Sequence, residues 1–193
     1  GEHIRQYLDD HDVRLIGSAA PHGSSRAIVQ RGAGGEPTYV FNEAAQRRSI
    51  HFSDDARAAI TEADLVVVSC FPFDVPTEVD ALIDATRGAR LAIDPNPRAG
   101  MLADREEFVR GFERLIPGAA VVKVGADDAS LLYDSDLDAL RARLRAAGSG
   151  AVIATAGSAG ATLESDAGIV TAAIAALPGR IVDTVGAGDA TLA

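Results

Sequence analysis

The sequence predicts an α/β protein built on a mostly parallel β-sheet with helices on its faces. From residue 53 onward, short apolar runs alternate four times with helical segments of roughly ten residues. The run at 65–68 is continuously apolar, which is typical of a strand buried on both faces. Alternation of this kind indicates parallel βαβ units.

The patterning predicts the elements in order. We expect helices at 2–10, 54–61, 75–85, 104–115, 126–132 and 137–146. We expect strands at 13–17, 27–30, 37–41, 65–68, 91–93, 120–124, 151–155, 161–164 and 169–175. The strands at 27–30 and 37–41 flank a glycine-rich turn, which predicts a β-hairpin.

Composition excludes several classes of protein. The chain has 193 residues, 47% of them hydrophobic and 24% charged, which is ordinary for a globular core and excludes wholesale disorder, collagen and coiled coil. Its net charge of −10 disfavours nucleic acid as a partner. The single cysteine, Cys70, cannot form an intrachain disulfide, so a cytoplasmic location is expected. No apolar stretch approaches the ~20 residues of a membrane span, so no membrane association is expected.

Residues 183–189, Asp-Thr-Val-Gly-Ala-Gly-Asp, carry most of the chemical signal. The small residues Gly186, Ala187 and Gly188 allow backbone N–H groups to converge on an anion. A helix that begins there adds its positive end to the same field. Asp189 would stand beside the anion, where a carboxylate can accept the proton of an attacking hydroxyl. A Gly-x-Gly-Asp run alone would also fit a tight turn with a helix cap.

With these residues the chain resembles the ribokinase-like (PfkB) carbohydrate kinases, whose signature DTxGAGD matches residues 183–189 fully. Residues 94–98, Asp-Pro-Asn-Pro-Arg, resemble the D-P-N-x-R of the fructokinase and 2-keto-3-deoxygluconate kinase branch. Residues 122–128 resemble the family's K-x-N-x-x-E stretch, and 155–160 its T-x-G-x-x-G turn. The resemblance covers essentially all of residues 1–193, read as part of one ribokinase-like domain. It implies a three-layer α/β fold with a β lid hairpin at about 24–42.

The resemblance also implies roles for particular residues. The enzyme would be an ATP-dependent sugar kinase, with Asp189 as catalytic base and Arg98 near the transferring phosphate. It would use ATP and Mg²⁺, and K⁺ as in many members. The remaining implied contacts fall into two groups. Those to ATP and its phosphates are Gly186, Ala187, Gly188, Lys123, Thr155, Gly157 and Gly160. Those to metals are Asp128 for Mg²⁺ through water, and Asp183 with the Val185 carbonyl for the monovalent cation.

Some positions depart from the family pattern and keep alternatives open. Gly125 stands where many members have Asn or Ser, and Asp128 is shorter than the usual Glu. Lys123 could equally be a solvated strand residue. The alternatives are a nucleoside kinase of the same fold and a non-catalytic sugar- or nucleotide-binding relic. A dinucleotide-binding module is disfavoured because no G-x-G-x-x-G follows the first strand.

The sugar-binding GG-x-x-x-N segment and the adenine-binding loop of the family are not found in these residues. We therefore expect an internal fragment lacking both ends, inactive on its own. A homodimer formed through the lid is also expected from the resemblance.

Overall fold

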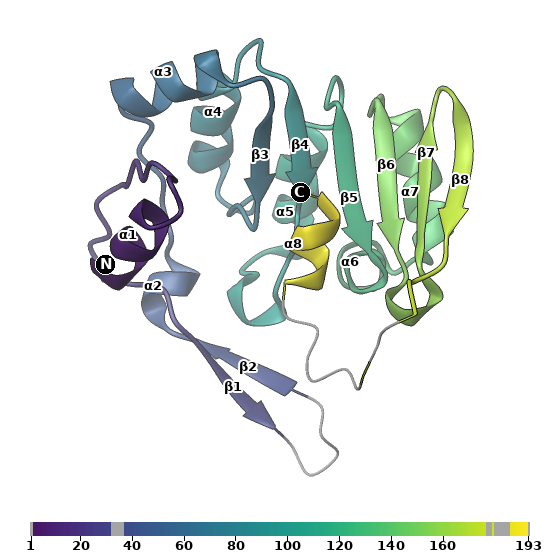
Figure 1. Cartoon of the computed structure of the whole chain (residues 1–193), viewed down its shortest axis with the longest axis horizontal. Helices are drawn as coiled ribbons and strands as arrows, with labels where there is room; N and C mark the ends of the chain where they lie inside the picture. Colours follow the sequence, from purple (N-terminus) through teal and green to yellow (C-terminus); the bar gives the residue numbers. More distant parts are fainter. Residues whose placement is uncertain (1, 32–36, 177–178, 180–185, 193) are drawn as a thin grey trace.

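The computed structural model describes residues 2–31, 37–176, 179 and 186–192. At its centre is a six-stranded sheet in the order β3-β4-β5-β6-β7-β8 (Figure 1). The strands β3 (Val66–Ser69), β4 (Leu91–Asp94), β5 (Val121–Gly125) and β6 (Ala151–Thr155) are parallel. The hairpin of β7 (Ala161–Ser165) and β8 (Gly168–Ala172) extends the sheet antiparallel. The predicted α/β fold with a mostly parallel sheet is confirmed.

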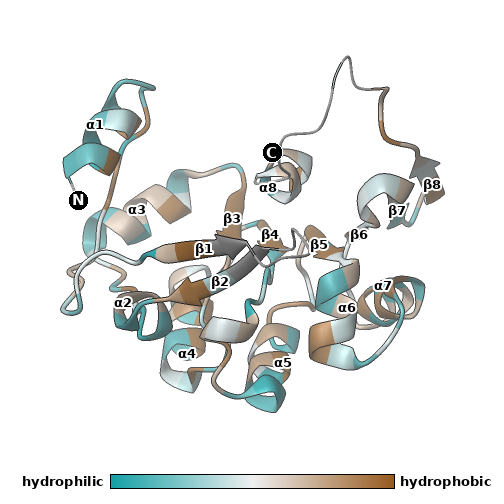
Figure 2. Cartoon of the chain, turned by 90° about the horizontal axis from the view of Figure 1, so that it is seen from below, coloured by the Kyte–Doolittle hydropathy of each residue, from teal (hydrophilic) through white to brown (hydrophobic). Residues whose placement is uncertain are grey.

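Helices lie on both faces of this sheet, unequally. The helices α4 (Pro76–Ala85), α5 (Arg105–Glu113), α6 (Ala126–Tyr133) and α7 (Leu137–Ala146) cover one face, and α8 (Ala187–Leu192) lies over the other (Figure 2). The four helices share a face because the parallel strands follow one another in a single direction and each crossover is right-handed. The helix α3 (Asp54–Glu62) leads into β3.

Side-chain caps fix where these helices begin. The side chains of Ser53, Asp104 and Asp136 each accept a hydrogen bond from the backbone N–H three residues later, at the starts of α3, α5 and α7. Such caps satisfy N–H groups that have no partner within the helix. Pro76 stands at the first turn of α4, where its missing N–H costs nothing.

The hydrophobic core lies between the sheet and α4–α7. Val122, Val124 and Val152 are fully buried there and belong to one cluster with Phe108 and Phe112. A glycine at 111 permits close packing, because a Cβ on it would collide with the backbone oxygen of Phe73. The core therefore holds the four parallel strands rigidly and fixes the position of their carboxyl ends.

The strand register shows which side chains line the opposite face of the sheet. Lys123 is aligned with Ile153, Ile153 with Leu163, and Leu163 with Val170, so these side chains project from the face that α8 covers. Val67 of β3 and Val170 of β8 are 53% and 64% exposed, whereas Ala92 of β4 is buried. Among the described residues, this face of the sheet is therefore covered at β4, in its middle, and exposed at the two outer strands, β3 and β8.

A separate two-stranded sheet stands off the main body at the carboxyl-end side (Figure 1). It pairs β1 (Ala27–Arg31) antiparallel with β2 (Pro37–Phe41), as the predicted hairpin required. The short helix α2 (Glu43–Gln46) follows it, capped by the Asn42 side chain, which also accepts from Arg26 N and donates to the Ser24 carbonyl. These bonds tie both ends of the hairpin together.

The strand predicted at 13–17 is wrong. The helix α1 (Glu2–Asp9) ends in a turn, with Asp12 at φ 55° and the Val13 N–H bonded back to the Leu8 carbonyl. This N–H is therefore used to terminate the helix instead of joining a sheet. None of the described helices is both long enough and apolar enough to cross a membrane.

Candidate active site

Charged side chains gather where β4 and β5 meet α8. Asp94 is the last residue of β4, Lys123 lies within β5, and the first turn of α8 begins at Ala187. In open parallel sheets, ligands bind beyond the carboxyl ends of the strands. The structure thus brings together three motifs that are far apart in the sequence: 94–98, 122–128 and 186–189.

Lys123 forms a buried ion pair with Asp94. Its Nζ lies 3.0 Å from Asp94 Oδ2, and the side chains are 8% and 1% exposed. Burial raises the pKa of Asp94, the ammonium of Lys123 opposes this rise, and the nearby carboxylate of Asp189 adds to it. The alternative that Lys123 is a solvated strand residue is therefore wrong.

The backbone of Gly188 lies directly against this lysine. A Cβ on Gly188 would be 2.8 Å from Lys123 Nζ. Gly186 precedes it with φ 81°, and its carbonyl accepts from Ala190 N in the first turn of α8. Of the three residues of the predicted anion loop, Gly186, Ala187 and Gly188, it is thus Gly188 whose backbone lies against the ammonium group of Lys123.

Asp128 is the second buried carboxylate. It stands in the first turn of α6, and its Oδ2 accepts a 2.7 Å hydrogen bond from the backbone N–H of Gly125. Its pKa is raised to about 6, mainly by burial and in smaller part by the charge of Asp94, while the hydrogen bond from Gly125 opposes the rise. The neighbouring Asp127 is exposed.

Arg98 and Asp189 are exposed residues at the rim of this cluster. The charge of Arg98 lowers the pKa of both Asp94 and Asp128, and the charge of Asp189 raises that of Asp94. Both predicted catalytic residues therefore act electrostatically on the same buried carboxylate. Both are also accessible to a ligand.

The predicted nucleotide turn lies beside the cluster, at the end of β6. Thr155 donates its hydroxyl to the Val124 carbonyl of the neighbouring strand. Gly157 is exposed, with open space where a Cβ would stand. Gly160 is buried, and a Cβ there would collide with the carbonyl of Ala172. The turn thus offers Gly157 to a ligand, while packing against β8 accounts for glycine at 160.

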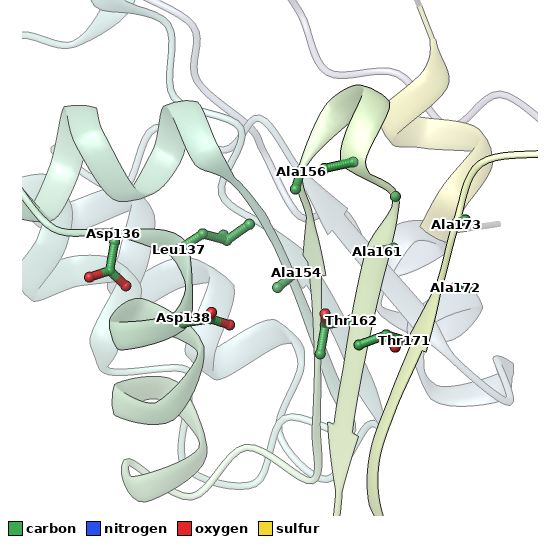
Figure 3. Close-up of a pocket in the computed structure, with 12 residues that line it drawn as sticks. Asp136, Leu137, Asp138, Ala154, Ala156, Ala161, Thr162, Thr171, Ala172 and Ala173 are labelled. Carbon is green, nitrogen blue, oxygen red and sulfur yellow. The ribbon is translucent and has the colours of Figure 1, made fainter.

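A pocket of about 490 Å³ adjoins this turn on the α7 side of the sheet (Figure 3). It lies between the start of α7, at Leu137, and the residues Ala154, Thr162 and Thr171 of the three last strands. The register aligns these three residues with one another, one position away from the Ile153 row. The pocket and the Lys123 cluster therefore lie on opposite faces of the sheet.

The described residues hold no group of three or more His, Cys, Asp or Glu side chains arranged to bind a metal. Mg²⁺ in phosphoryl-transfer sites needs only one or two carboxylates in addition to water and phosphates. Asp128 fits that requirement, and one oxygen of Asp94 is buried without a hydrogen-bond partner among the described residues. The predicted K⁺ ligands Asp183 and Val185 lie outside the described residues.

The comparison with known proteins decides the family. Residues 1–193 match the pfkB family carbohydrate kinases. The chain belongs to this family. The two halves of the site predicted from the family motifs, 94–128 and 186–189, are the halves that the structure brings together.

Individual relatives of this pfkB chain include enzymes of different names. It is 29% identical over 174 residues to the "Fructokinase" of Rhizobium leguminosarum bv. trifolii, covering 88% of this chain and 52% of that protein. A putative ribokinase II from E. coli, solved with ATP and Mg²⁺, superposes with a TM-score of 0.76 at 21% identity, over 97% of this chain and 62% of its own. Aminoimidazole riboside kinase from Salmonella enterica matches at 26% identity with a TM-score of 0.53, over 65% of this chain and 44% of its own.

The pfkB chain thus spans about half the length of the curated relative that it matches. Its similarity to the E. coli structure shows the shared ribokinase-like fold.

Sequence reasoning missed two features of the site. The motif 94–98 pointed to Arg98, whereas the charged residue of that motif that is buried is Asp94. The seat of the hairpin was also missed: the ring of Phe41 lies against Gly100, two residues after Arg98. The Asp94–Lys123 pair could have been found from one signal. Two neighbouring apolar strand segments each contain a charged residue, and the two charges are opposite.

Proposed function

We propose that the protein containing this chain is an ATP-dependent kinase that phosphorylates a sugar hydroxyl, of the fructokinase or 2-keto-3-deoxygluconate kinase type. The observation that carries the proposal is the contact between Gly188 of the 186–189 loop and the buried Lys123, with Asp189 and Arg98 close enough to act on the charge of Asp94. The similarity to a fructokinase and the 94–98 motif support this choice of substrate class.

In the proposed reaction, Asp189 acts as the general base. A hydroxyl oxygen of the sugar attacks the γ-phosphorus of ATP, the bond from that phosphorus to the bridging oxygen breaks, and ADP leaves. The hydroxyl proton passes to the Asp189 carboxylate. Asp189 is suited to this role because its side chain is exposed and because it follows Gly188 directly, in the first turn of α8.

The charge that develops on the transferred phosphoryl group needs positive partners. The N–H groups of Gly186, Ala187 and Gly188, the ammonium of Lys123 beneath them and the guanidinium of Arg98 are the proposed partners. Mg²⁺ held through water by Asp128 would neutralise further phosphate charge. K⁺ held at Asp183 and the Val185 carbonyl remains part of the proposal from the family resemblance. Thr155 and Gly157 would contact the nucleotide along their turn.

The β1–β2 hairpin is the proposed lid over the sugar and the proposed contact between subunits of a homodimer. Its two faces both carry exposed apolar side chains: Ile28 and Val40 on one, Val29 and Tyr39 on the other. One face can cover a bound sugar while the other pairs with a second hairpin. Membrane association is not part of this proposal, nor is nucleic acid, since the chain carries a net charge of −10. A cytoplasmic location fits it.

A nucleoside kinase is the second candidate, favoured by the 26% identity to a riboside kinase. The two are separated by a substrate panel containing fructose, 2-keto-3-deoxygluconate, ribose and adenosine, with ADP release as the readout. Turnover only with adenosine would replace the sugar by a nucleoside. Binding of ATP without turnover on any acceptor would identify a non-catalytic relic.

The variant Asp189→Asn tests the mechanism in the complete protein. It should lower kcat by roughly 10²–10⁴-fold while leaving ATP affinity nearly unchanged, because Asn keeps the shape but cannot accept the proton. Asp55→Asn is the matched control, since Asp55 is also an exposed carboxylate in the first turn of a helix, remote from the site. A kcat of Asp189→Asn within about threefold of the parent would remove Asp189 from the role of base.

A further inference from the structure

The Asp94–Lys123 pair is poorly explained as a stabilising contact. Both groups are almost completely removed from water, and Asp94 Oδ1 is buried without a hydrogen-bond partner among the described residues. Removing two charges from water is costly, and well-packed apolar residues in their place are often equally or more stabilising. A half-satisfied ion pair in a sheet is therefore more readily explained by what it does at the site.

The geometry limits what the pair can do. Lys123 reaches past β5 to the backbone of α8, where only the missing side chain of Gly188 leaves room for its Nζ. A lysine side chain has four rotatable bonds and would otherwise sample many positions. The 3.0 Å contact with Asp94 Oδ2 selects one of them.

The anchor itself is rigid. Asp94 ends a strand whose four residues are all buried, and its backbone carbonyl accepts from Cys70 N of the adjacent loop. The position of Asp94 is therefore fixed by its buried strand and by this backbone hydrogen bond, and Asp94 in turn holds Lys123. The alternative anchor, Asp128, is engaged by the N–H of Gly125.

We propose that Asp94 is a positioning residue, whose carboxylate holds the ammonium of Lys123 against the backbone of Gly188 and acts on phosphoryl transfer through that lysine. The inference rests on the proposed kinase function. It adds to that function a residue that does not touch the phosphate itself. Asp94 also keeps the positive charge in place before a nucleotide arrives, so the site need not reorganise when it binds.

The proposal predicts a specific pattern in a double-mutant cycle. In the complete protein, Asp94→Asn should lower kcat by about 10- to 100-fold, with the KM for sugar changed less than threefold, because a misplaced charge acts on the transition state. Lys123→Met should lower kcat by at least as much. In the Lys123→Met background, Asp94→Asn should have less than a twofold further effect, since Asp94 then has nothing to position.

The pair formed by Arg141 and Glu164, between α7 and β7, provides the control. Glu164→Gln removes a half-buried ion pair away from the site and should leave kcat unchanged. Urea unfolding of each variant separates loss of fold from loss of function: Asp94→Asn should keep its cooperative transition. Independent, multiplicative effects of Asp94→Asn and Lys123→Met on kcat would overturn the proposal, as would an unchanged kcat in Asp94→Asn.

A second readout keeps this proposal distinct from the kinase function. If the unmodified protein turns over no acceptor, the proposed function fails, and the affinities for ADP and a non-hydrolysable ATP analogue decide the role of Asp94. Asp94→Asn should then reduce the preference for the triphosphate by at least about fivefold, and only when Lys123 is present. An unchanged preference, or no nucleotide binding by the unmodified protein, would overturn the inference.

Discussion

The ring of Phe41 occupies the space that Gly100 leaves open. A Cβ on Gly100 would lie 2.9 Å from Cδ2 of this ring, and the Gln46 side chain donates to the carbonyl of the same glycine. Gly100 belongs to η1 (Ala99–Met101), the short 3-10 helix that follows Arg98. The base of the hairpin therefore rests on the segment that carries the proposed phosphate-side arginine.

Gly100→Val should disturb this seat without affecting the core. The added side chain forces the Phe41 ring to move, so we expect a several-fold rise in the KM for sugar with little change in stability. Steady-state kinetics together with urea unfolding check this. The double variant Gly100→Val/Phe41→Leu should regain part of the lost affinity, and a KM unchanged in both variants would contradict the seating of the hairpin.

Arg98→Ala should lower kcat more than it raises the KM for sugar. The guanidinium is exposed at the rim and is placed to stabilise charge that develops on the phosphoryl group, an effect worth about 10²-fold for a comparable donor. Arg105→Ala is the matched control, since Arg105 is exposed and pairs with Asp134. A change confined to the sugar KM would make Arg98 a specificity residue instead.

Asp128 should make the stability of the metal-free protein depend on pH. Burial raises its pKa to about 6, so between about pH 4 and 6 the folded state holds a proton that the unfolded state has lost. Stability therefore falls as pH rises through this window and levels off above it, by up to about 3 kcal/mol from this group.

Asp128→Asn should remove that part of the pH dependence, because Asn stays neutral. Urea unfolding at pH 4, 5, 6 and 7 without Mg²⁺ measures it as the difference from the parent, since the raised pKa of Asp94 acts in the same direction in both proteins. Asp127→Asn, at the exposed neighbour, should leave the profile unchanged. Parallel profiles for the parent and Asp128→Asn would contradict the burial of an uncharged carboxyl.

Gly111→Ala should destabilise the fold by about 1–3 kcal/mol, through overpacking against backbone that cannot move aside. The new methyl group would collide with the carbonyl of Phe73 and press on Val79. Glu106→Ala, on the exposed side of the same helix, is the control. Equal denaturant midpoints for the two variants would show that α5 can shift away from the 71–73 segment.

Most of the fold could be predicted because its elements are set by local patterning. The helix at 137–146 and the glycine-rich hairpin each carry a sequence signal that tertiary contacts reinforce. The run at 65–68 does form a strand, but its predicted burial on both faces is wrong, because β3 lies at the edge of the described sheet and Val67 is 53% exposed. The segment at 13–17 has the same apolar composition as a strand, yet the turn after α1 takes its first N–H. Periodicity cannot detect such competition between a helix end and a sheet.

The site could be predicted in part, for a different reason. The residues of the 186–189 loop are identified by their small size and their order, which any sequence displays directly. The state of Lys123 depends instead on β4 being the neighbour of β5 and on α8 crossing above both. That information lies in the sheet order, so a residue equally suited to water or to an ion pair could not be assigned beforehand.

Because Lys123 and Gly188 are in contact, the residue accommodated at one of these two positions depends on the residue at the other, although they lie far apart in the sequence. A side chain at 188 would push the ammonium of Lys123 away from its contact with Asp94, and a shorter residue at 123 would leave Asp94 as a buried charge without its counter-ion. Substitutions at 94, 123 and 188 are therefore expected to depend on one another. A library that varies 94, 123 and 188 together therefore samples combinations that a library confined to the 186–189 loop does not contain.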